Sequence, residues 1–191
     1  WMEDILHDGD YAAAQEAIVP EKLGRSHVFY LPYLMGERSP INDTNARAVF
    51  LGMPMDTTRA DMTQAMLEGV AFALRDSVEV ARSLGLDISR STLCGGGSRA
   101  TLWRTILANV LGSPLDLPAT EQGPGYGAAL LALVACGRYR NVAEVSRAML
   151  HIQATVQPDP ELTALYDARY AEFKQIYPAC RPLFASLAGT P

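Results

Sequence analysis

Residues 48–53 read Ala-Val-Phe-Leu-Gly-Met and, after a spacer of seven residues, residues 61–68 read Asp-Met-Thr-Gln-Ala-Met-Leu-Glu. The first segment has the β-branched and aromatic composition of a short strand that a glycine ends. From the second segment onward, small or apolar residues recur with the spacing of one helical face, at Met62, Met66, Gly69, Val70 and Ala73. This stretch therefore predicts a strand, a loop and a long amphipathic helix, as in an α/β fold.

The predicted helix has start and stop signals of its own. Thr58 is an N-cap residue, and Asp61 follows three residues later as its capping-box partner. The helix is expected to end around Leu84, with Gly85 in the left-handed conformation that closes many helices. Gly69 inside the helix costs about 1 kcal/mol relative to alanine, which indicates that another backbone passes close to it.

Further strands and helices are expected on both sides of this segment. Residues 27–31 form an aromatic, β-branched strand candidate that runs into a loop containing proline and glycine at 32–40. Strand candidates at 91–94 and 114–118 are each followed by glycines and then by a helix. Residues 162–177 carry a large aromatic stripe on one helical face, so this face is expected to be buried. The repeated order of strand, glycines and helix favours an α/β fold.

Composition excludes several classes of protein. The chain has 191 residues, of which 49% are hydrophobic and 19% charged, and its net charge is −5. This apolar content is too high for a disordered chain, and no uncharged apolar run approaches the ~20 residues of a membrane span. The acidic balance gives no basic surface for a phosphate backbone. Neither a membrane nor a nucleic acid is expected as a partner.

The cysteines and the first residue bear on where the protein works. Cys94, Cys136 and Cys180 are widely spaced and form no Cys-x-x-Cys pair, which favours neither a disulfide framework nor a zinc knuckle and fits a reducing cytoplasm. The three histidines lie far apart, so no protein metal site is expected. The chain starts at Trp1 without a signal-peptide pattern, and we interpret this start as a cut inside a longer protein.

A run of glycines is the main candidate for a ligand site. Residues 95–98 read Gly-Gly-Gly-Ser between a predicted strand and a predicted helix. Glycines let a ligand approach the backbone closely, and a helix start offers N–H groups without helical partners. The run lacks the Lys-Ser/Thr of a P-loop and the spacing of a dinucleotide fingerprint. On the pattern alone, a nucleotide site and a tight structural turn both stay open.

For other polar and aromatic residues, a structural role and ligand binding both stay open. Glu37 and Arg38 either order their own loop or reach a polar substrate. Trp103 and Tyr126 have ring faces able to stack on adenine. Trp103, however, lies on the apolar stripe of its predicted helix and is expected in the core.

These segments together resemble the carboxy-terminal domain of the FGGY carbohydrate kinases, which belong to the actin-like ATPase superfamily. Residues 48–68 agree with the second signature of that family at every restricted position. The loop at 31–40 and the run at 95–104 are similar to those of its xylulokinase and gluconate kinase branches. The resemblance covers roughly residues 25–185.

The resemblance implies a fold and a site. The fold would be an actin-like ATPase domain, ribonuclease H-like and α/β, in which helices flank a mixed sheet. Residues 1–191 would then be one amino-terminally truncated ATP-binding domain, the nucleotide-side lobe of a two-domain kinase. The residues expected to bind the nucleotide are Gly95, Gly96, Gly97, Ser98, Ala100 and Thr101. Ala100 stands where glycerol kinases carry an asparagine that contacts adenine, so its side chain cannot make that contact.

The resemblance also implies an activity that needs residues outside this chain. The family transfers the γ-phosphoryl group of MgATP to a sugar hydroxyl in a cleft between two domains. The sugar-binding domain, the catalytic aspartate and the phosphate-binding loop would all lie upstream of Trp1. D-xylulose is the expected substrate, with gluconate or another sugar or polyol as the alternative. A noncatalytic nucleotide-binding module is the alternative from another class, and whether the protein forms a homodimer stays open.

Overall fold

Helix α3 (Arg59–Ser83) runs through the body of the molecule, and the computed structural model describes residues 10–119 and 123–188 around it. A capping box closes its first turn: Thr58 Oγ1 accepts from the Asp61 N–H at 3.2 Å, and the Asp61 carboxylate accepts from the Thr58 N–H at 2.9 Å. The Thr58 hydroxyl also donates to this carboxylate, at 2.6 Å, and this bond first, then the one from the Thr58 N–H, holds the pKa of Asp61 below its ordinary value. Past the other end, Gly85 has a φ of +82°. Both predicted ends of the helix are confirmed.

The glycine inside α3 makes room for a strand. Strand β1 (Phe29–Leu31) crosses the helix so closely that a Cβ on Gly69 would lie 2.0 Å from the Tyr30 carbonyl oxygen. Strand β2 (Val49–Leu51) pairs with β1 in antiparallel register, with Tyr30 opposite Phe50. The prediction that a backbone passes Gly69 is confirmed.

A second sheet has three strands and lies beside α4. Strand β3 (Ser91–Thr92) lies parallel to β4 (Leu115–Pro118), and β4 pairs antiparallel with β5 (Ile152–Val156), so this sheet is mixed. The 3-10 turn η2 (Gly96–Arg99) and helix α4 (Thr101–Leu111) connect β3 to β4. The predicted mixed sheet with flanking helices is confirmed, although β1 and β2 form a separate two-stranded sheet.

A carboxylate in the centre of the mixed sheet joins its strands. Asp116 on β4 accepts a hydrogen bond from Thr155 Oγ1 on β5 at 2.6 Å, and Arg90 Nη1 lies 2.8 and 2.9 Å from its two oxygens. The Thr155 hydroxyl first, and then Arg90, hold the pKa of Asp116 below its ordinary value. The sheet is therefore held by side-chain as well as backbone hydrogen bonds.

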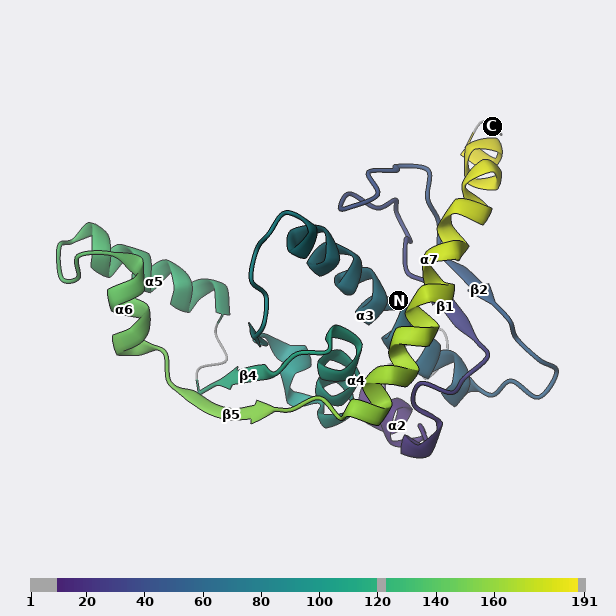
Figure 1. Cartoon of the computed structure of the whole chain (residues 1–191), viewed down its shortest axis with the longest axis horizontal. Coiled ribbons are helices and arrows are strands. Elements are labelled where there is room, and N and C mark those ends of the chain that lie inside the picture. Colours follow the sequence, from purple (N-terminus) through teal and green to yellow (C-terminus); the bar gives the residue numbers. More distant parts are fainter. Residues whose placement is uncertain (1–9, 120–122, 189–191) are drawn as a thin grey trace.

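The core lies where helix α7 (Pro160–Ala188) packs against α3 and α4 (Figure 1). The Phe72 ring of α3 lies 6.0, 6.0 and 5.2 Å from the rings of Tyr166, Tyr170 and Phe173 of α7. Full burial of one large apolar side chain contributes about 1.5–3 kcal/mol, so this face holds much of the fold together. The expected burial of the aromatic stripe is confirmed.

Two helices extend away from this body. Figure 1 shows α5 (Gly123–Ala135) and α6 (Val142–Met149) side by side at one end of the molecule, joined to the body through β4 and β5. The Tyr126 hydroxyl of α5 donates to the Met149 carbonyl of α6 at 2.7 Å. The helix predicted after the strand candidate at 114–118 is present, and its first turns include the glycines that were expected to precede it. Tyr126 is thus engaged within this pair of helices.

The first described element is helix α2 (Tyr11–Glu16), which the 3-10 turn η1 (Pro20–Lys22) follows. The Asp10 side chain caps α2 by accepting from the Ala13 N–H at 3.0 Å. Asp10 is thus the start signal of this helix, and Pro20 begins the turn that follows it.

Candidate functional site

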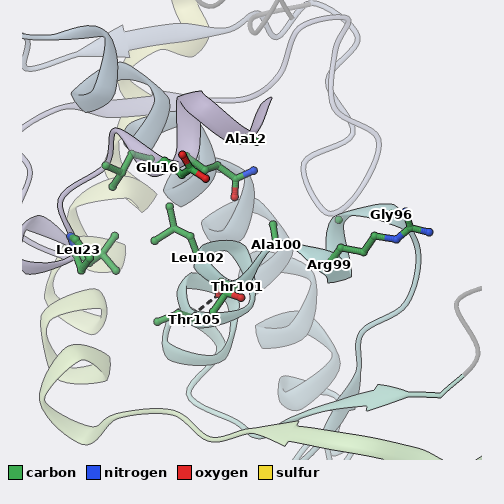
Figure 2. Close-up of a pocket in the computed structure, with 13 residues that line it drawn as sticks. Ala12, Glu16, Leu23, Gly96, Arg99, Ala100, Thr101, Leu102 and Thr105 are labelled. Atoms are coloured by element: carbon green, nitrogen blue, oxygen red, sulfur yellow. Dashed lines mark hydrogen bonds between the residues drawn. The ribbon is translucent and has the colours of Figure 1, made fainter. Parts of the chain in front are cut away.

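A large cavity lies between two segments that are far apart in the sequence. Residues 12–23, from α2 and η1, form one wall, and residues 96–105, from η2 and α4, form the other. Figure 2 shows Ala12 and Glu16 of α2 across the cavity from Ala100 and Leu102. The volume is about 940 Å³. This is within the range of pockets that hold small molecules and cofactors.

The glycine run forms a tight turn at one end of the cavity. Gly95 has a φ of +90°, a conformation that residues with a Cβ rarely adopt. Its carbonyl oxygen accepts from the Ser98 N–H at 3.0 Å and from Ser98 Oγ at 2.7 Å. A Cβ built on Gly96 would have no other heavy atom within 4 Å. Gly95 therefore serves the turn, whereas Gly96 leaves open space beside the backbone.

The start of α4 adds backbone donors to this wall. Ala100 is the N-cap residue and provides no side-chain hydrogen bond. The first N–H groups of any α-helix have no partner within the helix, and here they belong to cavity-lining residues such as Thr101 and Leu102. Such N–H groups, at the positive end of the helix dipole, favour polar or anionic ligand groups.

The structure separates the six predicted nucleotide-binding residues into two groups. Gly96, Gly97, Ala100 and Thr101 line the cavity. Gly95 and Ser98 do not line it. Ser98 instead faces a second cavity of about 400 Å³ behind the turn, where Arg104 donates a hydrogen bond to its carbonyl oxygen.

The wall formed by residues 12–23 was not predicted as part of any site. Ala14, Ile18 and Leu23 of this segment are buried, and Ile18 and Leu23 also line the cavity. The only sequence signals here are the Asp10 cap and the break at Pro20, and these indicate a short helix rather than a ligand wall. Nothing in the local pattern points to residues more than seventy positions away.

Of the remaining candidates, Glu37 and Trp103 have structural roles. Glu37 Oε1 accepts from the Ser39 N–H at 3.0 Å, and the Glu37 backbone exchanges two hydrogen bonds with Asp43, so Glu37 orders its own loop. Arg38 is exposed. Trp103 is partly buried against the main core, beside Gly97, in agreement with its expected place there.

Neither a metal cluster nor a membrane span is found among the described residues. Residues 10–119 and 123–188 contain no group of three or more His, Cys, Asp or Glu side chains able to hold a metal ion. Within the same ranges, no helix is long and apolar enough to cross a membrane.

The sequence matches one known protein family over most of its length. The family model described as "FGGY family of carbohydrate kinases, C-terminal domain" matches residues 3–136. The chain belongs to this family. As an FGGY chain it is 35% identical, over 175 residues, to the xylulose kinase of Escherichia coli, an alignment that covers 91% of this chain and 35% of that protein.

Solved structures agree on the fold of this FGGY chain. The xylulose kinase of Lactobacillus acidophilus superposes with a TM-score of 0.85 at 24% identity, covering 98% of this chain and 38% of that one. The gluconate kinase of the same organism gives 0.84 at 23% identity, with coverages of 98% and 38%. The chain thus spans little more than a third of the proteins it matches.

Proposed function

We propose that this chain is the nucleotide-side lobe of a carbohydrate kinase, and that the whole protein transfers the γ-phosphoryl group of MgATP to a sugar hydroxyl. The observation that carries the proposal is the cavity in which the bare backbone of Gly96 and Gly97 faces residues 12–23. Its volume of about 940 Å³ and its lining, which is mostly apolar with a few polar side chains, fit an adenosine group. Membership in the FGGY family supports the same assignment.

The six predicted residues take two roles in this proposal. Gly96, Gly97, Ala100 and Thr101 are assigned to direct contact with the nucleotide, mostly through the backbone. Gly95 and Ser98 are assigned to holding the turn, because both are engaged in its internal hydrogen bonds. Ala100 presents only a methyl group, so purine recognition depends on shape and backbone rather than on this side chain. ATP, when bound, supplies the phosphoryl group that is transferred.

We assign the sugar site and the general base to the part of the polypeptide outside this chain. The matched relatives are almost three times as long as their aligned part, since this chain covers 35–38% of them. D-xylulose is the proposed substrate because the E. coli xylulose kinase is 35% identical to this chain. Gluconate is the alternative, since the gluconate kinase has nearly the same TM-score as the xylulose kinase, 0.84 against 0.85. A reducing cytoplasm is the proposed location.

The isolated chain is expected to show no sugar phosphorylation. Phosphoryl transfer depends almost wholly on positioning and charge stabilisation, so a lobe without the sugar site and base should lose turnover rather than slow it. A coupled ADP-release assay with MgATP, with and without D-xylulose, measures this directly. Release stimulated by D-xylulose in the purified chain, and abolished in a matched Gly96→Val preparation, would contradict the division of roles.

The whole protein separates the proposed activity from its alternatives. D-xylulose should give the highest specificity constant among ketoses and aldonates. A tenfold preference for gluconate, equivalent to about 1.4 kcal/mol of transition-state binding, would replace the substrate while keeping the sugar kinase. Bound MgATP with no phosphorylation of any sugar or polyol would favour a noncatalytic nucleotide-binding module instead.

A further inference from the structure

The cavity wall at residues 20–24 is held by the side chains of other helices. Two side chains of α3, Gln64 and Glu68, are both 1% exposed and lie beneath this wall. Gln64 Nε2 donates to the Lys22 carbonyl oxygen at 2.9 Å. Glu68 Oε1 accepts from the Gly24 N–H at 3.2 Å. The two hydrogen bonds therefore fix the backbone on either side of Leu23, which lines the cavity.

Glu68 is the centre of a buried hydrogen-bond network. Its Oε1 also accepts from Gln64 Nε2 at 2.8 Å and from the Tyr166 hydroxyl at 3.1 Å. Its Oε2 accepts from Arg169 Nη2 at 2.9 Å. The burial of the Tyr166 hydroxyl, with the Glu68 charge beside it, raises the pKa of Tyr166, so this tyrosine stays a donor. Both carboxylate oxygens are therefore satisfied inside the protein.

The same network continues along the chain beyond the wall. Arg169 of α7 donates to the Ser26 carbonyl oxygen, and its Nη2 donates to that of Val28 at 3.0 Å. Together with Lys22 and Gly24, this makes four backbone groups between residues 22 and 28 that three side chains hold. A buried ion pair is weak evidence for stability, because desolvation offsets its attraction. The contacts of Glu68 and Arg169 instead fix the path of one backbone segment.

The fit under this segment is close. Gly24 has a φ of +70°, and a Cβ on it would lie 3.0 Å from the Cβ of Leu165 in α7. The segment thus rests directly on α7 while α3 holds it from the side. A small change in these anchors would shift Leu23, and the cavity would change width.

We infer that Gln64 and Glu68 are positioning residues, which set the width of the nucleotide cavity by fixing the backbone of residues 22–24 on α3. The inference rests on the proposed function, since it takes the cavity to hold a nucleotide. Neither side chain lines the cavity, so each acts through Leu23 and its neighbours. The stretch 61–68, which marks the family in the sequence, thereby connects the long helix to the site.

Gln64→Met is the variant that tests this role. Methionine keeps the length and shape of glutamine but cannot donate to the Lys22 carbonyl oxygen or to Glu68 Oε1. That oxygen keeps a partner, since the Arg25 N–H donates to it at 3.0 Å, so the variant leaves it satisfied. The matched control is Tyr170→Phe, which removes a 2.6 Å hydrogen bond from Tyr170 of α7 to Asp76 of α3, away from the nucleotide cavity.

The experiment measures ADP affinity, amide hydrogen exchange of residues 20–25 and the unfolding midpoint in the wild type and both variants. In Gln64→Met we expect exchange of residues 20–25 to speed up and the ADP dissociation constant to rise about fivefold or more, for a coupling of roughly 1 kcal/mol. In Tyr170→Phe neither the exchange of residues 20–25 nor the ADP dissociation constant should change, even where its unfolding midpoint falls as far as that of Gln64→Met. In the whole protein, the KM for ATP should rise while kcat stays close to that of the wild type.

The outcomes separate this inference from the proposed function. A wild-type chain in which saturating ADP leaves residues 12–23 and 96–105 unaffected would overturn the proposed function. A wild type that binds ADP there, with Gln64→Met binding equally well, would overturn the positioning role alone. Equal loss of affinity in Gln64→Met and Tyr170→Phe would reduce Gln64 to a structural residue and also overturn it. Gln64→Ala is the second variant should Gln64→Met fail to fold.

Discussion

Gly69→Ala should destabilise the protein by on the order of 3 kcal/mol or more, or prevent it from folding, although alanine is the better helix former. The added Cβ would lie 2.0 Å from the Tyr30 carbonyl oxygen and 3.0 Å from its carbonyl carbon. Both atoms belong to the backbone of β1, so no side chain can rotate away. Either α3 or β1 must move, and that disturbs the core that both elements share.

Urea unfolding followed by circular dichroism gives the free energy of unfolding for this comparison. The control is Gly127→Ala, also inside a helix, where a Cβ would have no other heavy atom within 4 Å. There the gain in helix propensity should leave stability unchanged or raise it by about 0.5–1 kcal/mol. Equal effects at both positions would mean that β1 does not pass α3 as described.

Gly96→Val should lower nucleotide affinity at least tenfold, about 1.4 kcal/mol, with little change in stability. The two effects separate because Gly96 lines the cavity while its Cβ position is otherwise empty. A valine side chain there would occupy space that the proposed nucleotide needs. The backbone of Gly96, unlike that of Gly95, does not have a positive φ, so strain in the turn is not expected.

Calorimetric titration with ADP, together with the unfolding midpoint, measures both halves of this prediction. The matched control is Gly125→Val, at another glycine with open space around its Cβ position, on the pair of helices that extends from the body. That variant should bind as the wild type does. A Gly96→Val variant with wild-type affinity would remove the glycine turn from the nucleotide site.

The parts of the fold that were predicted correctly depend on neighbours in the sequence. Thr58 and Asp61 cap α3 through contacts three residues apart, and the close approach at Gly69 follows from the cost of a glycine inside a helix. The aromatic stripe of α7 predicted a buried face from its spacing alone. Its partner, Phe72, lies about a hundred positions earlier, and spacing within α7 could not identify it.

Only one of the two cavity walls was indicated by the sequence, for a similar reason. The glycine turn has a local signature, so the sequence alone indicates a candidate ligand site there, and its binding of a nucleotide stays a prediction. The opposite wall at residues 12–23 carries no ligand signature, because its role comes from packing against α3 and α4. Strand β5 was also missed, since Ile152–Val156 is exposed along much of its length and lacks a buried alternation.

The identity of the sugar lies beyond both the sequence and this fold. The residues of this chain that match the family lie on the proposed nucleotide side. Xylulose and gluconate kinases share the fold almost equally, with TM-scores of 0.85 and 0.84 to this chain. Substrate choice is a difference in transition-state binding at the sugar, which we assign to the rest of the polypeptide.

Residue-level titration of the isotopically labelled chain with ADP tests the central claim most directly. Backbone amide shifts in an NMR spectrum report on each residue as ADP is raised to millimolar concentrations. The cavity assignment predicts saturable shifts in residues 12–23 and 96–105, with none in α5 and α6. Saturable shifts confined to another surface, or none anywhere in a folded chain, would contradict the assignment of this cavity to a nucleotide.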